Sequence, residues 1–173
     1  IRAQAAQFPS VRLIEQNDSL GFSFAGGKPT RPVSKGLSDI PARLRQMDEQ
    51  KIERQVNGAW LDMFGYEIPA DEGARWSRLI NEHLALAAKA ESRFIPLATV
   101  PLQDGALAAE VLREAHGNGF KGAMIGTQPK GVGGVLDDPG AVLAGAGREG
   151  QREARGIRDA VSRNIERAEN IPR

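Results

Sequence analysis

The sequence contains no cysteine, only two histidines and a single tyrosine among its 173 residues. Without cysteine the chain can form no disulfide, hold no metal through a thiolate and use no cysteine nucleophile, which fits a reducing compartment. Lysine and arginine number 23 against 22 acidic residues, so the net charge of +1 creates no strong field toward nucleic acid or anionic lipid. The apolar runs are too short to span a membrane, and no signal-peptide pattern is present. We therefore expect a cytoplasmic protein that binds neither nucleic acid nor membrane.

A strand–helix–strand pattern lies in the middle of the chain. Residues 94–100 and 122–127 are short apolar runs, and between them Asp104 precedes a segment whose apolar residues share one helical face. These residues are Leu107, Ala108, Val111, Leu112 and Ala115. Two strands joined by one crossover helix run parallel in the same sheet. Because a parallel sheet is buried on both faces, we expect further strand and helix units beside this one.

The preceding segments extend this alternation. Residues 70–90 carry the clearest helical pattern, and residues 52–60 are the next candidate strand. The apolar stripe of the predicted helix consists of Trp76, Leu79, Ile80, His83, Leu84 and Ala87, while Glu72, Arg75, Arg78 and Glu82 lie mostly off it. Asp39 is placed to cap a further helix with Pro41 in its first turn. The alternation of helices and strands predicts an α/β fold.

Both ends of the chain differ from this central region. Apolar stretches at residues 11–14 and 22–24 predict an N-terminal hairpin, followed by a surface loop at residues 25–38. At the other end, residues 140–150 are mostly Gly and Ala and predict a linker. Residues 151–173 are rich in Arg and Glu, and we predict an amphipathic helical tail there. Its apolar face would consist of Ile157, Val161, Ile165 and Ala168.

The predicted linker contains a Gly-x-Gly-x-x-Gly motif between Gly145 and Gly150. Backbone amides at such a turn can hold a pyrophosphate, so nucleotide binding is one alternative function. The motif is not followed by a second strand with an acidic ribose ligand, and this favours the linker interpretation.

Five short motifs occur in order between about residues 25 and 139. They are Arg-Pro-Val at 31–33, Met-Phe-Gly-Tyr at 63–66, Val-Pro-Leu-Gln-Asp at 100–104, Ile-Gly at 125–126 and Leu-Asp-Asp at 136–138. In this order and spacing they resemble the aminocarboxymuconate-semialdehyde decarboxylase branch of the amidohydrolase superfamily. The resemblance implies a (β/α)8 barrel with a divalent metal, usually zinc, at the carboxyl ends of its strands. It also implies non-oxidative decarboxylation of an unsaturated or aromatic carboxylate, with hydrolases and hydratases as relatives.

A complete barrel of this kind needs on the order of 250 residues. We therefore expect residues 1–139 to form a partial (β/α)8 TIM barrel of roughly three to four βα units, with the N-terminal hairpin as an insertion. The metal ligands of the family are a His-x-His pair, further histidines and an aspartate, and this chain does not contain them. We expect a relative of metal-dependent carboxy-lyases, with zinc as the family's cofactor, that is inactive as this chain alone.

The resemblance points to Arg31 as a binding residue, because the family uses an arginine at this position to hold a substrate carboxylate. A guanidinium suits this role through its planar fork of donors, and the alternative is an exposed arginine on a loop. Phe64 and Tyr66 follow the strand predicted at 52–60, where a barrel mouth would offer an apolar wall and a hydroxyl to an unsaturated acid. Packing beneath the loop is the alternative for both residues, and for Trp60 packing is preferred.

No catalytic residue or metal ligand is assigned from the sequence. His83 lies on a helical stripe and His116 near a helix end, so both are predicted to be structural rather than zinc ligands. The ligand expected from the resemblance is a small-molecule carboxylate. The alternative is a non-catalytic α/β scaffold or oligomerisation module, because an incomplete barrel leaves open sheet edges that favour a homo-oligomer.

Overall fold

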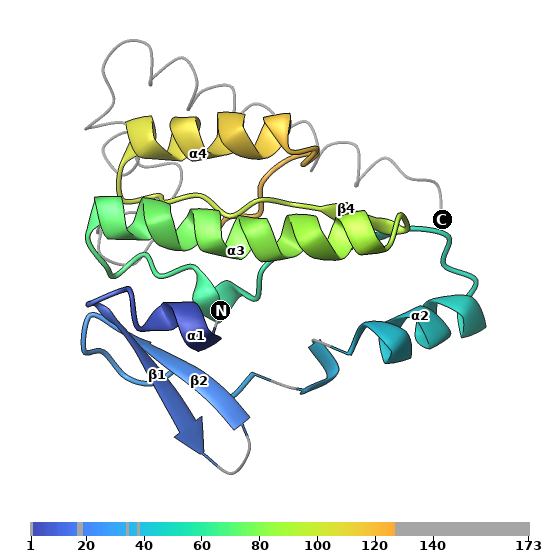
Figure 1. Cartoon of the computed structure of the whole chain (residues 1–173), viewed down its shortest axis with the longest axis horizontal. Helices are drawn as coiled ribbons and strands as arrows, with labels where there is room; N and C mark the ends of the chain where they lie inside the picture. Colours follow the sequence, from blue (N-terminus) through green and yellow to red (C-terminus); the bar gives the residue numbers. More distant parts are fainter. Residues whose placement is uncertain (1, 17–18, 34, 38, 127–173) are drawn as a thin grey trace.

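The computed structural model describes residues 2–16, 19–33, 35–37 and 39–126. The predicted linker, the helical tail, the motif between Gly145 and Gly150 and the Leu-Asp-Asp motif lie outside these residues. In chain order the elements are α1 (Arg2–Ala5), β1 (Val11–Gln16), β2 (Ser19–Phe24), the 3-10 turn η1 (Lys35–Leu37), α2 (Ile40–Glu49), β3 (Gln55–Asn57), the 3-10 turn η2 (Leu61–Met63), α3 (Ala70–Ala90), β4 (Phe94–Pro96) and α4 (Gly105–Gly117) (Figure 1). The described part is therefore a mixed α/β structure with two small sheets.

Two consecutive strand–helix units form the centre of this structure. β3 and β4 are parallel neighbours, with Val56 in register with Ile95, and α3 connects them. The chain beyond β4 forms a parallel bridge between Ala98 and Ala123, with α4 as the crossover. α3 and α4 lie side by side (Figure 1). The parallel arrangement of the two apolar runs around α4 is confirmed, although the second run forms a single bridge and not the predicted strand. Closure of such units into a barrel stays a prediction.

The regular strands are shorter than the apolar runs that predicted them. The backbone carbonyls of Ile52 and Glu53, before β3, accept hydrogen bonds from the Arg93 guanidinium at 2.7 and 3.3 Å. That part of the predicted strand thus bonds to a side chain instead of a neighbouring strand. Beyond β4, Ala98 and Val100 are fully buried, so the apolar run continues the core without a regular ladder.

The N-terminal hairpin is confirmed and packs on α3. β1 and β2 are antiparallel, and two phenylalanines of β2, together with Phe8 before β1, surround the fully buried Trp76. The ring centroids of Phe8, Phe22 and Phe24 lie 5.1, 5.7 and 5.7 Å from the indole, each in an edge-on arrangement. Such aromatic contacts add to the free energy gained by burying apolar area, and they fix the hairpin on the helix.

The helices predicted within the described part of the chain are also confirmed. α2 begins after Asp39, whose carboxylate accepts a hydrogen bond from the Ala42 N–H at 2.9 Å. α3 spans the residues predicted for it. Glu72 differs from the prediction, because its side chain is only 6% exposed and accepts a hydrogen bond from the Ser10 N–H at 2.8 Å. No helix among the described residues is both long enough and apolar enough to cross a lipid bilayer.

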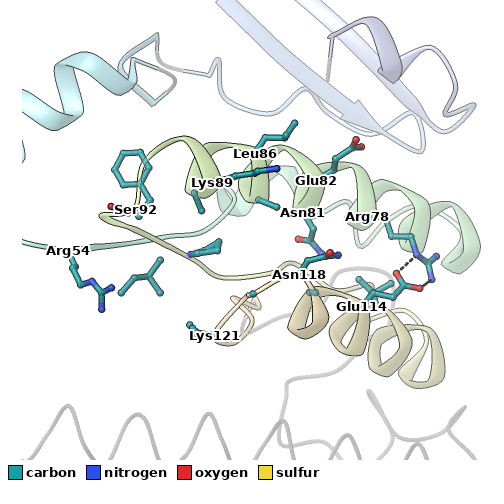
Figure 2. Close-up of a pocket in the computed structure, with 18 residues that line it drawn as sticks. Arg54, Arg78, Asn81, Glu82, Leu86, Lys89, Ser92, Glu114, Asn118 and Lys121 are labelled. Carbon is teal, nitrogen blue, oxygen red and sulfur yellow. Dashed lines mark hydrogen bonds and ion pairs between the residues drawn. The ribbon is translucent and has the colours of Figure 1, made fainter.

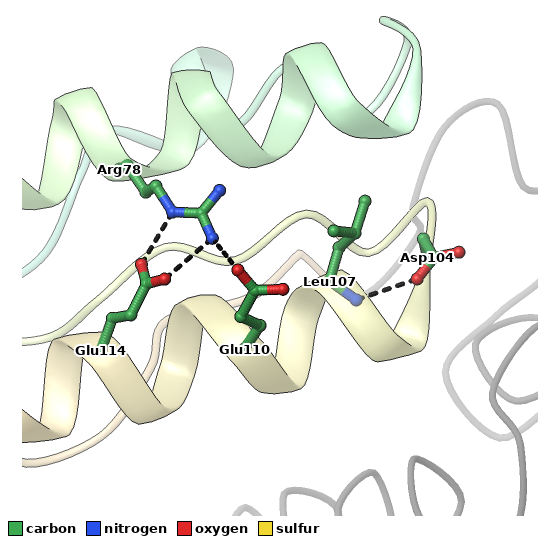
Figure 3. A network of polar contacts seen from close by, with 5 residues as sticks. All are labelled: Arg78, Asp104, Leu107, Glu110 and Glu114. Atoms are coloured by element: carbon green, nitrogen blue, oxygen red, sulfur yellow. Dashed lines mark hydrogen bonds and ion pairs between the residues drawn. The ribbon is translucent and has the colours of Figure 1, made fainter.

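Polar contacts hold α3 against α4 and the strand segment below them. Arg78 of α3 binds Glu114 with two hydrogen bonds of 2.7 and 2.9 Å and Glu110 with one of 2.6 Å, while Asp104 caps α4 (Figure 3). In the core, the Asn81 side chain donates to the Thr99 carbonyl at 3.0 Å and accepts from the Thr99 N–H at 2.8 Å. This pair fixes the chain just beyond β4, where the strands approach the candidate site.

Candidate functional site

A cavity of about 680 Å³ lies at the carboxyl ends of the parallel strands. Its lining comes from the loop after β2, from residues 61–67 after β3, and from Gly126 after the bridged Ala123. We call it the carboxyl-end cavity. Parallel α/β proteins bind their ligands at this end of the strands, because loops from several strands converge there.

The three binding residues predicted from the sequence line this one cavity. Arg31 comes from the loop after β2, and Phe64 and Tyr66 come from the segment after η2. Phe64 and Tyr66 are both buried, and their ring centroids are 5.4 Å apart. Both rings thus pack in the hydrophobic core and also line the cavity, while their role in binding a substrate stays a prediction.

Two glycines let the chain pass close to these aromatic rings. Gly65, between Phe64 and Tyr66, has a φ of +66°, a conformation that glycine adopts without strain. A Cβ on Gly126 would lie 3.1 Å from Tyr66 Cε2, closer than a side chain normally approaches. The Gly126 N–H donates a hydrogen bond to the Tyr66 hydroxyl oxygen at 3.2 Å. The Ile-Gly motif and the Met-Phe-Gly-Tyr motif thus meet in space at the cavity.

Burial raises the pKa of Tyr66. Desolvation raises the pKa of its phenol to about 12, although the hydrogen bond from Gly126 acts in the opposite direction. The phenol, which is already neutral at physiological pH with its ordinary pKa of about 10, thus keeps its proton to a higher pH. Because its oxygen accepts from Gly126, its own proton is available for an acceptor such as a carboxylate oxygen.

Arg31 lies at the exposed rim of the cavity. It contacts Asp62 in η2 and Trp60, which directly precedes η2. Its Nε donates to Asp62 Oδ2 at 2.9 Å, and its Nη2 donates to Asp62 Oδ1 at 3.2 Å. The guanidinium carbon lies 5.4 Å from the ring centroid of Trp60, a cation–π distance. The hydrogen bonds and charge of Asp62 raise the pKa of Arg31, so the side chain is cationic at any relevant pH. Sequence reasoning missed both contacts, and Trp60 is more than a packing residue.

A second, larger cavity of about 870 Å³ lies at the opposite end of the strands, between α3 and α4 (Figure 2). Arg54, Ser92 and Lys121, which line it, each precede one of the three parallel strand segments. This is the amino end of the strands, whereas parallel α/β proteins bind their ligands at the carboxyl ends. The carboxyl-end cavity is therefore the better candidate despite its smaller volume.

The described residues contain no group of three or more His, Asp or Glu side chains able to hold a metal ion. His83 Nε2 lies 3.1 Å from Gln4 Oε1, and partial burial lowers the pKa of His83. His116 is exposed in the last turn of α4. The zinc implied by the resemblance thus finds no set of ligands in this part of the chain, since a mononuclear zinc site needs at least three protein ligands.

No protein-family model matches the chain. The features that point to a function are the geometry of the carboxyl-end cavity and the sequence motifs that meet there.

Proposed function

We propose that the carboxyl-end cavity binds the carboxylate of a small unsaturated or aromatic acid. The observation that supports this proposal is the convergence of Arg31, Phe64 and Tyr66 on one cavity at the carboxyl ends of the strands. These residues supply the three properties that such a ligand needs, namely a fixed positive charge, a planar apolar surface and a neutral hydrogen-bond donor.

In the proposed complex the ligand carboxylate lies at Arg31, and its unsaturated part lies against the rings of Phe64 and Tyr66. The Tyr66 hydroxyl donates a hydrogen bond to a ligand oxygen, while the Gly126 N–H continues to donate a hydrogen bond to the Tyr66 oxygen. Arg31 is exposed, so water weakens its attraction for an anion. We therefore expect a dissociation constant on the order of 1 mM, which corresponds to about 4 kcal/mol of binding free energy.

We further propose that this binding site belongs to a metal-dependent carboxy-lyase or a related amidohydrolase, as the sequence motifs imply. Within that reaction class, the residues described here bind and orient the carboxylate, and no catalytic step is assigned to them. The absence of cysteine supports a cytoplasmic location. Elemental analysis of the purified chain tests whether this chain alone holds the metal, and we expect no stoichiometric zinc. Stoichiometric zinc would contradict the view that this chain alone lacks the metal site.

Carboxylate binding is tested by NMR titration of the full chain with benzoate. The neutral analogue benzamide has nearly the same shape and serves as the ligand control. We expect benzoate to bind at least about fivefold more tightly than benzamide, and Arg31→Gln to weaken benzoate binding about tenfold. Arg12→Gln removes an equally permanent charge from an exposed position on β1 and should leave the affinity unchanged. Benzoate binding of equal strength in wild type and Arg31→Gln would overturn the proposal.

A second candidate function is self-association through β3. Among the described residues β3 pairs only with β4, and Val56 in β3 is 57% exposed, whereas parallel strands are normally covered on both faces. Light scattering coupled to size exclusion tests this scaffold function, with a dimer expected for wild type and a monomer for Val56→Lys. Leu86→Lys is the matched control, because Leu86 on α3 is equally exposed. A monomeric wild type, or equal dissociation in both variants, would exclude pairing through β3.

A further inference from the structure

The carboxylate of Asp62 already occupies the donor fork that the proposed ligand would use. Arg31 gives Asp62 two parallel hydrogen bonds, from Nε and Nη2, which is the geometry of arginine with a bound carboxylate. Both side chains line the carboxyl-end cavity, with side-chain exposures of 74% for Arg31 and 27% for Asp62. The internal pair is thus open to exchange with an anion from solution.

Resting on the proposed function, we propose that Asp62 is an internal competitor for the ligand carboxylate at Arg31 and so determines the affinity of the site. A ligand carboxylate has two ways to reach Arg31. It can displace Asp62 from the Nε–Nη2 edge, which breaks the internal pair. It can instead take the other edge, formed by Nη1 and the second N–H of Nη2, where the negative charge of Asp62 repels it. In both cases Asp62 weakens the binding of an anion.

The surroundings of Arg31 make this competition measurable. The Arg31 guanidinium also lies over the ring of Trp60, a second contact that involves no atom of Asp62. Removing the charge of Asp62 should therefore leave Arg31 stacked at the rim of the cavity with its fork available. Exposed ion pairs are weak, so the gain from removing the competitor is modest. We expect Asp62→Asn to lower the dissociation constant for benzoate about fivefold, which corresponds to about 1 kcal/mol.

The test is a benzoate titration of full-length wild type, Asp62→Asn and the double variant that also carries Arg31→Gln. The affinity for benzoate should increase in Asp62→Asn, and this increase should be absent when Arg31 is also replaced. Asp48→Asn is the matched control, because Asp48 forms the other Asp–Arg pair among the described residues, with Arg93 at 2.6 Å, and lies outside the cavity. It removes the same charge and should leave benzoate binding unchanged. Asp62→Ser provides a second measurement, since asparagine keeps an acceptor oxygen where the carboxylate had one, whereas the single serine oxygen lies one bond closer to the backbone.

The outcomes separate this inference from the function on which it rests. If wild type binds benzoate through Arg31 but Asp62→Asn and Asp62→Ser bind it equally or more weakly, Asp62 positions Arg31 and the inference is wrong. If replacement of Arg31 leaves benzoate binding unchanged, the proposed function itself fails. An equal gain in Asp48→Asn would mean that overall charge, and not competition at Arg31, controls the affinity.

Discussion

Replacement of Trp76 by phenylalanine should lower the free energy of unfolding by about 2–4 kcal/mol. Trp76 is fully buried, and its indole N–H donates a hydrogen bond of 2.7 Å to the Met63 carbonyl. That carbonyl belongs to η2, directly before Phe64. The same indole contacts three phenylalanines of the N-terminal segment and hairpin. One side chain therefore connects α3, the hairpin and the segment that carries the candidate site.

The expected loss in the free energy of unfolding of Trp76→Phe has two parts. Phenylalanine cannot donate a hydrogen bond, so the partly buried Met63 carbonyl loses its partner, which costs about 1–3 kcal/mol. The smaller ring also leaves unfilled volume and weakens the edge-on contacts, which adds about 1 kcal/mol. For a domain stabilised by about 5–15 kcal/mol, this sum is a large fraction of the total.

Urea unfolding followed by far-ultraviolet circular dichroism measures the effect without relying on tryptophan fluorescence. Trp60→Phe is the natural control, because Trp60 is the only other tryptophan in the sequence and is partly exposed. It should change the free energy of unfolding by less than about 1 kcal/mol. A Trp76→Phe variant within about 0.5 kcal/mol of wild type would refute the role assigned to the indole.

Three further predictions concern other polar groups. Asn81→Ala leaves both Thr99 backbone groups without their side-chain partner and should cost about 2–4 kcal/mol in urea unfolding, whereas the exposed Glu82→Ala should cost less than about 0.5 kcal/mol. Tyr66 is the only tyrosine, so its ultraviolet titration should show a pKa of about 12, and a value near 10 would contradict its burial. Because the folded state keeps this proton to higher pH than the unfolded state, the stability due to Tyr66 is complete below about pH 10 and declines toward pH 12. Arg78→Gln should cost about 1 kcal/mol at low salt and less in 1 M sodium chloride, since its bonds to two glutamates of α4 are partly exposed; equal losses at both salt concentrations would argue against an ionic contribution.

Local patterns in the sequence predict most of the described secondary structure. α3 follows from its helical stripe, α2 from the cap at Asp39, and the parallel bridge at Ala98 from two apolar runs with a helix between them. These features depend on neighbours within a few positions or on the small number of ways to connect two strands. The burial of Glu72 was not predictable in this way, because it depends on the hairpin that covers the first turn of α3.

The candidate site was predictable only in part. The motifs identified Arg31, Phe64 and Tyr66, and the structure brings them to one cavity. The sequence carries no signal that pairs Arg31 with Asp62 or places Trp60 over it, since these contacts join segments that are distant along the chain. The competition inferred for Asp62 therefore comes from the structure alone.

Carboxylate binding at Arg31 in the carboxyl-end cavity is the proposal on which the role of Asp62 depends. The indole N–H signal of Trp60 in an NMR titration with benzoate reports on this site, because Trp60 lies beside Arg31. Trp76 provides an internal reference, since its indole is buried and bonded to Met63. We predict that the Trp60 signal shifts in a saturable manner, that the Trp76 signal shifts much less, and that benzamide has little effect. An unchanged Trp60 signal at saturating benzoate would contradict the claim.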